Sequence, residues 1–181
     1  MTIFAETFAT EYELTATVGD FTITAKTEYD DCMSQPWNEE CGHGPVRSLS
    51  RYSDRKAPSE MLLGEGWAYD FAEACKIALR DGWGIAGGKM EGESAKAYAA
   101  RCAMADFKHL QAWCNDDWHY CVLVVTVHCE GVEMAFESLG GMYSGDDDYL
   151  TETANELAET ALEAAKVEAE RLAKRFAAIA A

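Results

Sequence analysis

Residues 147–178 contain neither glycine nor proline, and this stretch limits the possible folds most strongly. Apolar side chains recur in it at helical spacing, at Leu150, Ala154, Leu157 and Ala161. A helix with one apolar face is stable when that face packs against another layer of structure. The pattern therefore predicts a long C-terminal helix over 147–178.

Two other segments have the patterns that are typical of strands. Residues 11–28 alternate apolar and polar side chains on either side of Gly19-Asp20, which predicts a β-hairpin. Residues 119–129 form a nearly continuous apolar run, which predicts a central strand covered on both faces. Glu130-Gly131 then turns the chain into a partner strand that begins at Val132.

Two helices are predicted between these hairpins. Asp70 and Glu73 make a capping-box-like start for a helix over 70–81, and a second helix follows over 94–114. Residues 29–68, in contrast, have no periodicity and contain all three prolines. We predict a long irregular loop there, and we expect a functional site in it because long loops in compact domains are usually functional.

The predicted order of elements is strand, strand, loop, helix, helix, strand, strand, helix. We expect a single α+β domain over residues 1–181, since a chain of 181 residues can bury a core of its own. Its sheet is expected to be four-stranded and mainly antiparallel, with helices packed on one face and the long acidic helix at the C-terminal end.

The net charge is −17, from 32 acidic and 15 basic residues. A surface that binds nucleic acid needs Lys and Arg to displace counterions from phosphates. We therefore expect no direct binding to nucleic acid or to an anionic membrane, and we expect a basic protein as partner. Charge that serves solubility alone is the alternative interpretation.

The acidic residues form a stripe on the predicted C-terminal helix. It spans roughly 22 Å at ~1.5 Å per residue, which gives one charge per ~4–5 Å, against one per ~1.7 Å of duplex DNA. A partner-binding surface that imitates DNA therefore needs more acidic residues than the stripe alone provides. The alternative interpretation is that the stripe is only the solvated face of the helix. The stripe consists of Asp148, Glu152, Glu156, Glu159 and Glu163, and the acids expected to join it are Asp116, Asp117, Asp146 and Asp147.

A basic island interrupts the acidic chain within residues 29–68. With His43 it forms a possible ligand-binding set, because guanidinium groups hold anions through paired hydrogen bonds. The island can equally fold back onto the protein's own carboxylates, and the large excess of acids favours this second interpretation. Its members are Arg47, Arg51, Arg55 and Lys56.

The sequence contains no recognisable catalytic or metal-binding motif. The spacing of Cys32, Cys41 and His43 matches no standard zinc pattern, so we predict no metal site. No catalytic residue and no cofactor are predicted, and the protein is not expected to be an enzyme. Residues 1–10 lack the features of a signal peptide, so we expect a cytoplasmic protein whose seven cysteines are reduced.

Several short motifs are spaced over about residues 29–118. They are Pro36-Trp37, Gly42-His43-Gly44-Pro45-Val46, Arg55-Lys56-x-Pro58, Tyr69-Asp70-Phe71-Ala72-Glu73-Ala74 and Asp81-Gly82-Trp83. This set resembles a group of small proteins without assigned chemistry that are encoded by bacteriophages and prophages. The resemblance implies a phage accessory protein that acts in the bacterial cytoplasm, and it implies no catalytic roles.

Three hypotheses of function follow. The leading hypothesis is a non-enzymatic protein that inhibits or modulates a host nucleic-acid-binding protein, such as one of a restriction or CRISPR-type defence system, through an acidic surface that mimics DNA. The second is a ligand-binding or enzymatic module that uses His43 and the nearby arginines of the 29–68 segment. The third is an assembly or scaffold protein that uses the long helix, and a homodimer remains possible.

Overall fold

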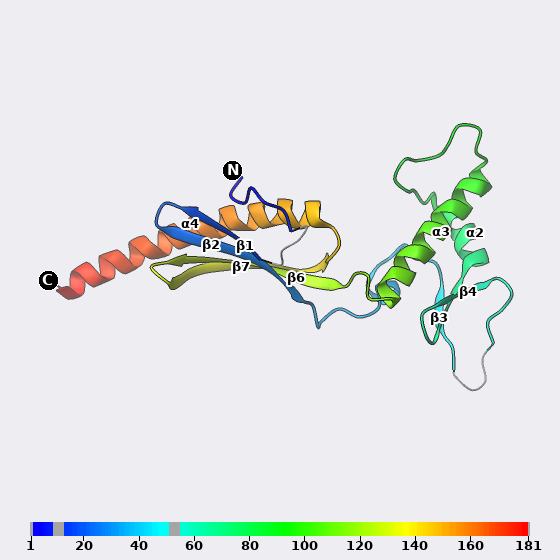
Figure 1. Ribbon diagram of the computed structural model, residues 1–181, viewed down its shortest axis with the longest axis horizontal. Helices are drawn as coiled ribbons and strands as arrows, with labels where there is room; N and C mark the ends of the chain where they lie inside the picture. Colours follow the sequence, from blue (N-terminus) through cyan, green and yellow to red (C-terminus); the bar gives the residue numbers. More distant parts are fainter. Residues whose placement is uncertain (1, 9–12, 51–54, 181) are drawn as a thin grey trace. The chain divides into compact units, whose positions relative to one another are not determined.

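The computed structural model describes residues 2–8, 13–50 and 55–180. These residues divide into two compact units, where the sequence predicted a single domain. Unit 1 comprises residues 1–32 and 119–181, and unit 2 comprises residues 33–118. Unit 2 is thus inserted between two strands of unit 1 (Figure 1).

Unit 1 contains the predicted four-stranded antiparallel sheet. Its strands are β1 (Glu13–Val18), β2 (Phe21–Tyr29), β6 (Tyr120–Cys129) and β7 (Val132–Tyr143), in that order across the sheet. The first hairpin closes at Gly19-Asp20, so that Val18 pairs with Phe21. In the second hairpin Glu130 and Gly131 both have positive φ, as a type I′ turn requires. The α+β class and the four-stranded sheet are therefore confirmed.

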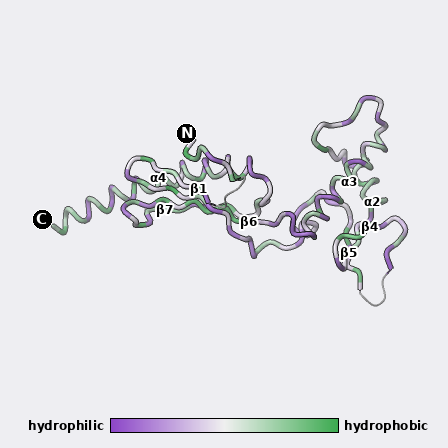
Figure 2. The backbone as a smooth tube through the Cα atoms, in the orientation of Figure 1, coloured by the Kyte–Doolittle hydropathy of each residue, from purple (hydrophilic) through white to green (hydrophobic). Residues whose placement is uncertain are grey.

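The long helix α4 (Asp147–Ala180) covers one face of this sheet (Figure 1). Its stripe of Leu150, Ala154, Ala158, Ala161 and Ala165 is fully buried against β6 and its neighbours. Alanine dominates the stripe, so the helix backbone lies close to the sheet. The side chains of β6 alternate between fully buried and half-buried, which differs from the predicted coverage of this strand on both faces. In Figure 2 hydrophobic (green) and hydrophilic (purple) residues alternate along α4, as expected for a helix with one apolar face.

Unit 2 contains secondary structure where the sequence predicted an irregular loop over 29–68. A three-stranded antiparallel sheet forms there in the order β3, β5, β4, preceded by a short helix. The three prolines explain why the prediction was wrong, since Pro36 begins the helix and Pro45 and Pro58 precede strands instead of interrupting them. The elements are α1 (Pro36–Glu39), β3 (Val46–Ser48), β4 (Glu60–Leu63) and β5 (Trp67–Asp70).

The two middle helices belong to unit 2, with ends close to those predicted. In α2 (Phe71–Asp81) the Asp70 side chain accepts the Glu73 backbone N–H, and Gly82 ends the helix in the left-handed conformation. In α3 (Ala95–Cys114) Ser94 caps the first turn in the same way. The two helices pack on each other and on β4, around a core that includes Leu63, Tyr69 and Leu110.

Candidate functional site

The acidic stripe predicted for the C-terminal helix lies on the exposed face of α4. Glu152, Glu156, Glu159 and Glu163 are all exposed, opposite the buried alanine stripe. At the start of the helix, the Asp146 carboxylate accepts the Tyr149 backbone N–H at 3.2 Å. The helix dipole favours acids in this first turn, because the N-terminal end of a helix carries partial positive charge.

A groove lies beside this stripe. It has a volume of about 480 Å³ and is lined by Thr2, Glu152, Asn155, Glu156 and Glu159. The Asn155 side-chain oxygen accepts the backbone N–H groups of Ile3 at 2.6 Å and Phe4 at 2.9 Å, which ties the N-terminal segment to α4. The groove is thus concave and acidic, a shape and charge that suit the long side chain of a Lys or Arg from another protein.

The two units differ strongly in charge. Unit 1 carries 19 acidic and 5 basic residues, a net charge of −14, whereas unit 2 carries 13 acidic and 10 basic residues, a net charge of −3. From residue 109 to residue 165 the chain contains no Lys or Arg at all. The excess of negative charge is therefore a property of unit 1.

The remaining predicted acids divide between the units. Asp146 and Asp148 are exposed and Asp147 is half-buried, all at the start of α4. Asp116 and Asp117 are also exposed, but they follow α3 in unit 2. The structure therefore places the predicted acids from Asp147 to Glu163 on α4 and Asp146 directly before it, while Asp116 and Asp117 belong to the other unit.

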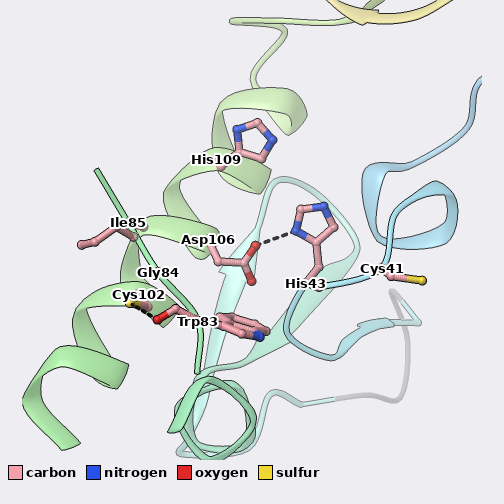
Figure 3. Close-up of a pocket in the computed structure, with 10 residues that line it drawn as sticks. Cys41, His43, Trp83, Gly84, Ile85, Cys102, Asp106 and His109 are labelled. Carbon is pink, nitrogen blue, oxygen red and sulfur yellow. Dashed lines mark hydrogen bonds and ion pairs between the residues drawn. The ribbon is translucent and has the colours of Figure 1, made fainter. Parts of the chain in front are cut away.

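His43 lies in unit 2, where a buried carboxylate holds it. The His43 Nδ1–H donates to Asp106 Oδ1 at 2.6 Å, from the segment before β3 to the middle of α3 (Figure 3). The second oxygen, Asp106 Oδ2, accepts the Gly44 backbone N–H at 2.8 Å and the Tyr69 hydroxyl at 2.7 Å. Three donors thus converge on one carboxylate.

The other ring nitrogen of His43 is also buried. Within the described part of the chain, Nε2 has no hydrogen-bond partner, and the Glu40 carboxylate lies 3.6 Å from it. Burial lowers the pKa of His43, but the hydrogen bond and negative charge of Asp106, together with Glu40, outweigh burial and leave the pKa above its usual value. The two carboxylates therefore stabilise the charged form of the imidazole.

His109 continues this cluster. Its ring stacks on His43 at a centroid distance of 6.0 Å and on Trp118 at 4.6 Å. Burial and then the positive charge of His43 lower the pKa of His109, against the opposing effect of the nearby acids. The pKa values of the two stacked histidines are thus shifted in opposite directions, upward for His43 and downward for His109.

A cavity of about 450 Å³ lies against His43 and Asp106, with walls that include Trp83, Ile85 and Cys102 (Figure 3). A carboxylate-held imidazole can transfer protons at its free nitrogen when a substrate reaches that nitrogen. Here Nε2 is enclosed, and the Cys41 thiol points away from the ring (Figure 3). The arrangement therefore acts as a polar clasp, defined as His43, Gly44, Tyr69 and Asp106, that fastens residues 43–44 to α3.

One arginine of the basic island, Arg47, folds back onto a carboxylate of the protein, which is the arrangement that the excess of acids favours. The Arg47 guanidinium donates to both Glu60 oxygens, at 2.7 and 2.8 Å, and also to the Arg55 carbonyl at 3.3 Å. The hydrogen bonds from Arg47 and from the Ala57 backbone hold the pKa of Glu60 at about 2. Arg51 lies outside the described residues. Arg47 is thus engaged in structure and is separate from the residues that line the cavity beside His43.

The sequence alone did not identify Asp106 as the partner of His43. One signal was present, because Asp106 occupies a position of the apolar stripe of α3 that also contains Ala99, Cys102, Ala103 and Leu110. A carboxylate in such a stripe is costly unless it is hydrogen-bonded. The residue that satisfies it, His43, lies 63 positions away and becomes its neighbour only in the folded unit.

Comparison with protein-family models, with curated proteins and with solved structures finds no significant match to this chain. Across the described residues, no three His, Cys, Asp or Glu side chains are arranged to hold a metal ion. No described helix combines the length and apolar character that crossing a bilayer requires.

Proposed function

We propose that this protein is a non-enzymatic phage accessory protein that binds a basic, nucleic-acid-binding host protein in the bacterial cytoplasm and inhibits or modulates it. Unit 1 supplies the binding surface, and the exposed acids of α4 occupy the place of nucleic-acid phosphates on the partner. A defence protein of the restriction or CRISPR type is the proposed class of target.

One observation carries this proposal, namely the concentration of charge on unit 1. Unit 1 has a net charge of −14, whereas unit 2 has only −3. A net charge with a magnitude of about 2–8 is normal for the solubility of a small domain, so the charge of unit 1 exceeds what solubility requires. The α4 carboxylates also repel each other at i, i+4 spacing, at a cost of about 0.2–0.5 kcal/mol per pair in an isolated helix. A function for the stripe explains why such a cost is retained.

The geometry adds a site for specific contact. The groove lined by Glu152, Glu156 and Glu159 can receive basic side chains that normally contact phosphates. The motifs that resemble those of the phage group supply the proposed cellular context, since a phage protein of this class would meet host nucleic-acid-binding proteins in the cytoplasm.

The test is a capture experiment with a matched control. Purified wild-type protein is compared with a variant in which Glu152, Glu156, Glu159 and Glu163 are all replaced by Gln. In the control variant Glu13, Glu28, Glu133 and Glu137 are replaced by Gln, which removes the same charge from the sheet of unit 1. We expect wild type and control to retain a basic host protein that duplex DNA displaces, and the α4 variant to lose it.

Displacement by DNA is the decisive part of this test. A captured protein that binds DNA and the wild-type chain simultaneously would contradict the proposal, since both ligands would then use different surfaces. Equal capture by the α4 variant and by wild type would show that the stripe is only a solvated face.

A further inference from the structure

The cavity beside the polar clasp has a size that suits a small-molecule ligand. Its volume is about 450 Å³, and ligand pockets usually measure about 300–1,000 Å³. Three segments of unit 2 build its described walls: residues 41–43, residues 83–85 and the part of α3 from Cys102 to His109 (Figure 3). The cavity therefore lies within one compact unit and shares no described residue with the acidic stripe on α4.

The apolar wall of this cavity is preformed. The Trp83 backbone N–H donates to the Ala78 carbonyl at 3.0 Å, and the Trp83 carbonyl accepts the Cys102 thiol at 3.4 Å. The Ile85 backbone N–H donates to the Tyr98 hydroxyl at 3.3 Å. Trp83 and Ile85 are half-buried, and both line the cavity. Binding to walls that are already fixed costs less conformational entropy.

The carboxylate of Asp106 supplies the polar wall with an acceptor. A carboxylate has about four acceptor sites. Asp106 Oδ2 accepts two hydrogen bonds, from Gly44 and Tyr69, whereas Oδ1 accepts one, from His43. Oδ1 therefore retains one acceptor site, and Asp106 is among the residues that line the cavity. A ligand that matches this wall carries a hydrogen-bond donor.

The charge around the cavity favours a cation. Among the described residues that line it, none is Lys or Arg. His43 lies between the carboxylates of Asp106, at 2.6 Å, and Glu40, at 3.6 Å, so these three groups together are negative even when the imidazole is charged. Burial and then the charge of His43 lower the pKa of His109, so this histidine adds little positive charge at about pH 7.5. An anion in the cavity would therefore face net negative charge.

An aromatic ring completes these requirements. Trp attracts a cation that lies over the face of its ring, and the attraction is stronger where water is partly excluded. We propose that the cavity binds a small arylalkylammonium ion. Its ammonium group donates to Asp106 Oδ1 beside the Trp83 ring, and its apolar body lies against Ile85 and Ala105. The polar clasp then has a second role, since it holds Asp106 in position for this ligand.

Three probes that differ in charge test the ligand class on the wild-type chain. Phenethylammonium, phenethyl alcohol and phenylacetate share one ring, and the amine is charged at about pH 7.5 because an alkylammonium group such as that of Lys has a pKa near 10.4. In titration calorimetry we expect saturable binding of the ammonium ion, at least tenfold tighter than that of the other two, which lose the charge-assisted hydrogen bond and the cation–π contact. The NMR signals of the Trp83, Ile85 and Asp106 amides should shift in the same titration. Absence of saturable binding, or equal binding of the alcohol or the carboxylate, would overturn the proposal.

Two matched substitutions on α3 locate the binding. Ala105→Phe fills the cavity, whereas Ala97→Phe places the same side chain at an exposed position. We expect the first variant to lose ammonium binding and the second to retain it. Since the acids of unit 1 attract cations as well, the α4 Gln variant is also titrated and should bind with unchanged affinity. Binding that Ala105→Phe leaves intact, or that the α4 Gln variant abolishes, would overturn the proposal. The probe series needs only wild type, so it remains decisive if urea unfolding shows that Ala105→Phe does not fold.

Discussion

At the scale of single residues, Asp106 is the side chain with the most demanding role in unit 2. It accepts hydrogen bonds from His43, Gly44 and Tyr69, and it is largely buried. We expect Asp106→Ala to destabilise the protein by about 2–4 kcal/mol, because buried donors then lack an acceptor. Urea unfolding followed by tryptophan fluorescence measures this, since all five tryptophans lie in unit 2. Lys108→Ala, at an exposed position nearby, is the control and should change little.

The charge of His43 makes the polar clasp dependent on pH. The pKa of His43 is raised in the folded protein, so its charged form contributes stability that is fully present below the unfolded pKa of about 6.5. This contribution is lost as the pH rises through the folded pKa. We therefore expect the stability difference between wild type and His43→Gln to be larger at acidic than at alkaline pH. A difference that stays constant or grows with pH would contradict the assignment.

Gly44 is required for the close packing behind the clasp. A Cβ atom at this position would lie 2.5 Å from the Tyr69 hydroxyl and 2.6 Å from the Ala74 side chain. We expect Gly44→Ala to cost at least about 1–3 kcal/mol through overpacking. At Gly84 the nearest atom to such a Cβ is the Tyr98 hydroxyl at 3.8 Å, so Gly84→Ala should be tolerated. Equal midpoints of urea unfolding for the two variants would contradict this.

At the scale of elements, removing the acidic stripe should not harm α4. Gln keeps the shape of Glu and most of its helix propensity, and the quadruple Gln variant relieves repulsion at i, i+4. We expect this variant to unfold at the same or a slightly higher urea concentration than wild type, measured by circular dichroism. A marked loss of stability would mean that the stripe has a structural role.

Local signals explain which elements the sequence predicted well. The Asp70, Gly82 and Ser94 helix ends and the Glu130-Gly131 turn depend on residues adjacent in sequence, and all of them are confirmed. The strands of residues 29–68 were missed, because strands of three or four residues are too short to show a period. Their pairing depends on contacts such as Val46 with Tyr69, which only the folded unit creates.

At the scale of the whole molecule, the division into two units was not predictable from local pattern. β2 and β6 are neighbours in one sheet although unit 2 separates them in sequence. Strands that follow each other in sequence usually pair. The sequence pattern therefore did not indicate that residues 33–118 fold as a separate unit between two paired strands. The His43–Asp106 pair was missed because its two residues lie 63 positions apart and become neighbours only once unit 2 is folded.

The unequal charge of the units leads to a prediction about salt. Screening reduces self-repulsion, and the reduction is greater for a net charge of −14 than for −3. We expect added salt to increase hydrogen-exchange protection of the β2 and β6 amides more than that of the α3 amides. An equal increase in both units would show that the stability of unit 1 is insensitive to its own charge.

The salt dependence of partner association tests the central proposal most directly. The measurement is the association rate of the wild-type chain with the captured host protein, at low and at moderate ionic strength. The Debye length shortens from about 30 Å at 0.01 M to about 8 Å at 0.15 M, so steering by the acidic face of unit 1 should weaken strongly. We predict a steep fall in the wild-type rate and a slow, nearly salt-independent rate for the α4 Gln variant. A wild-type rate that is fast and unaffected by salt, and equal to that of the variant, would contradict the account.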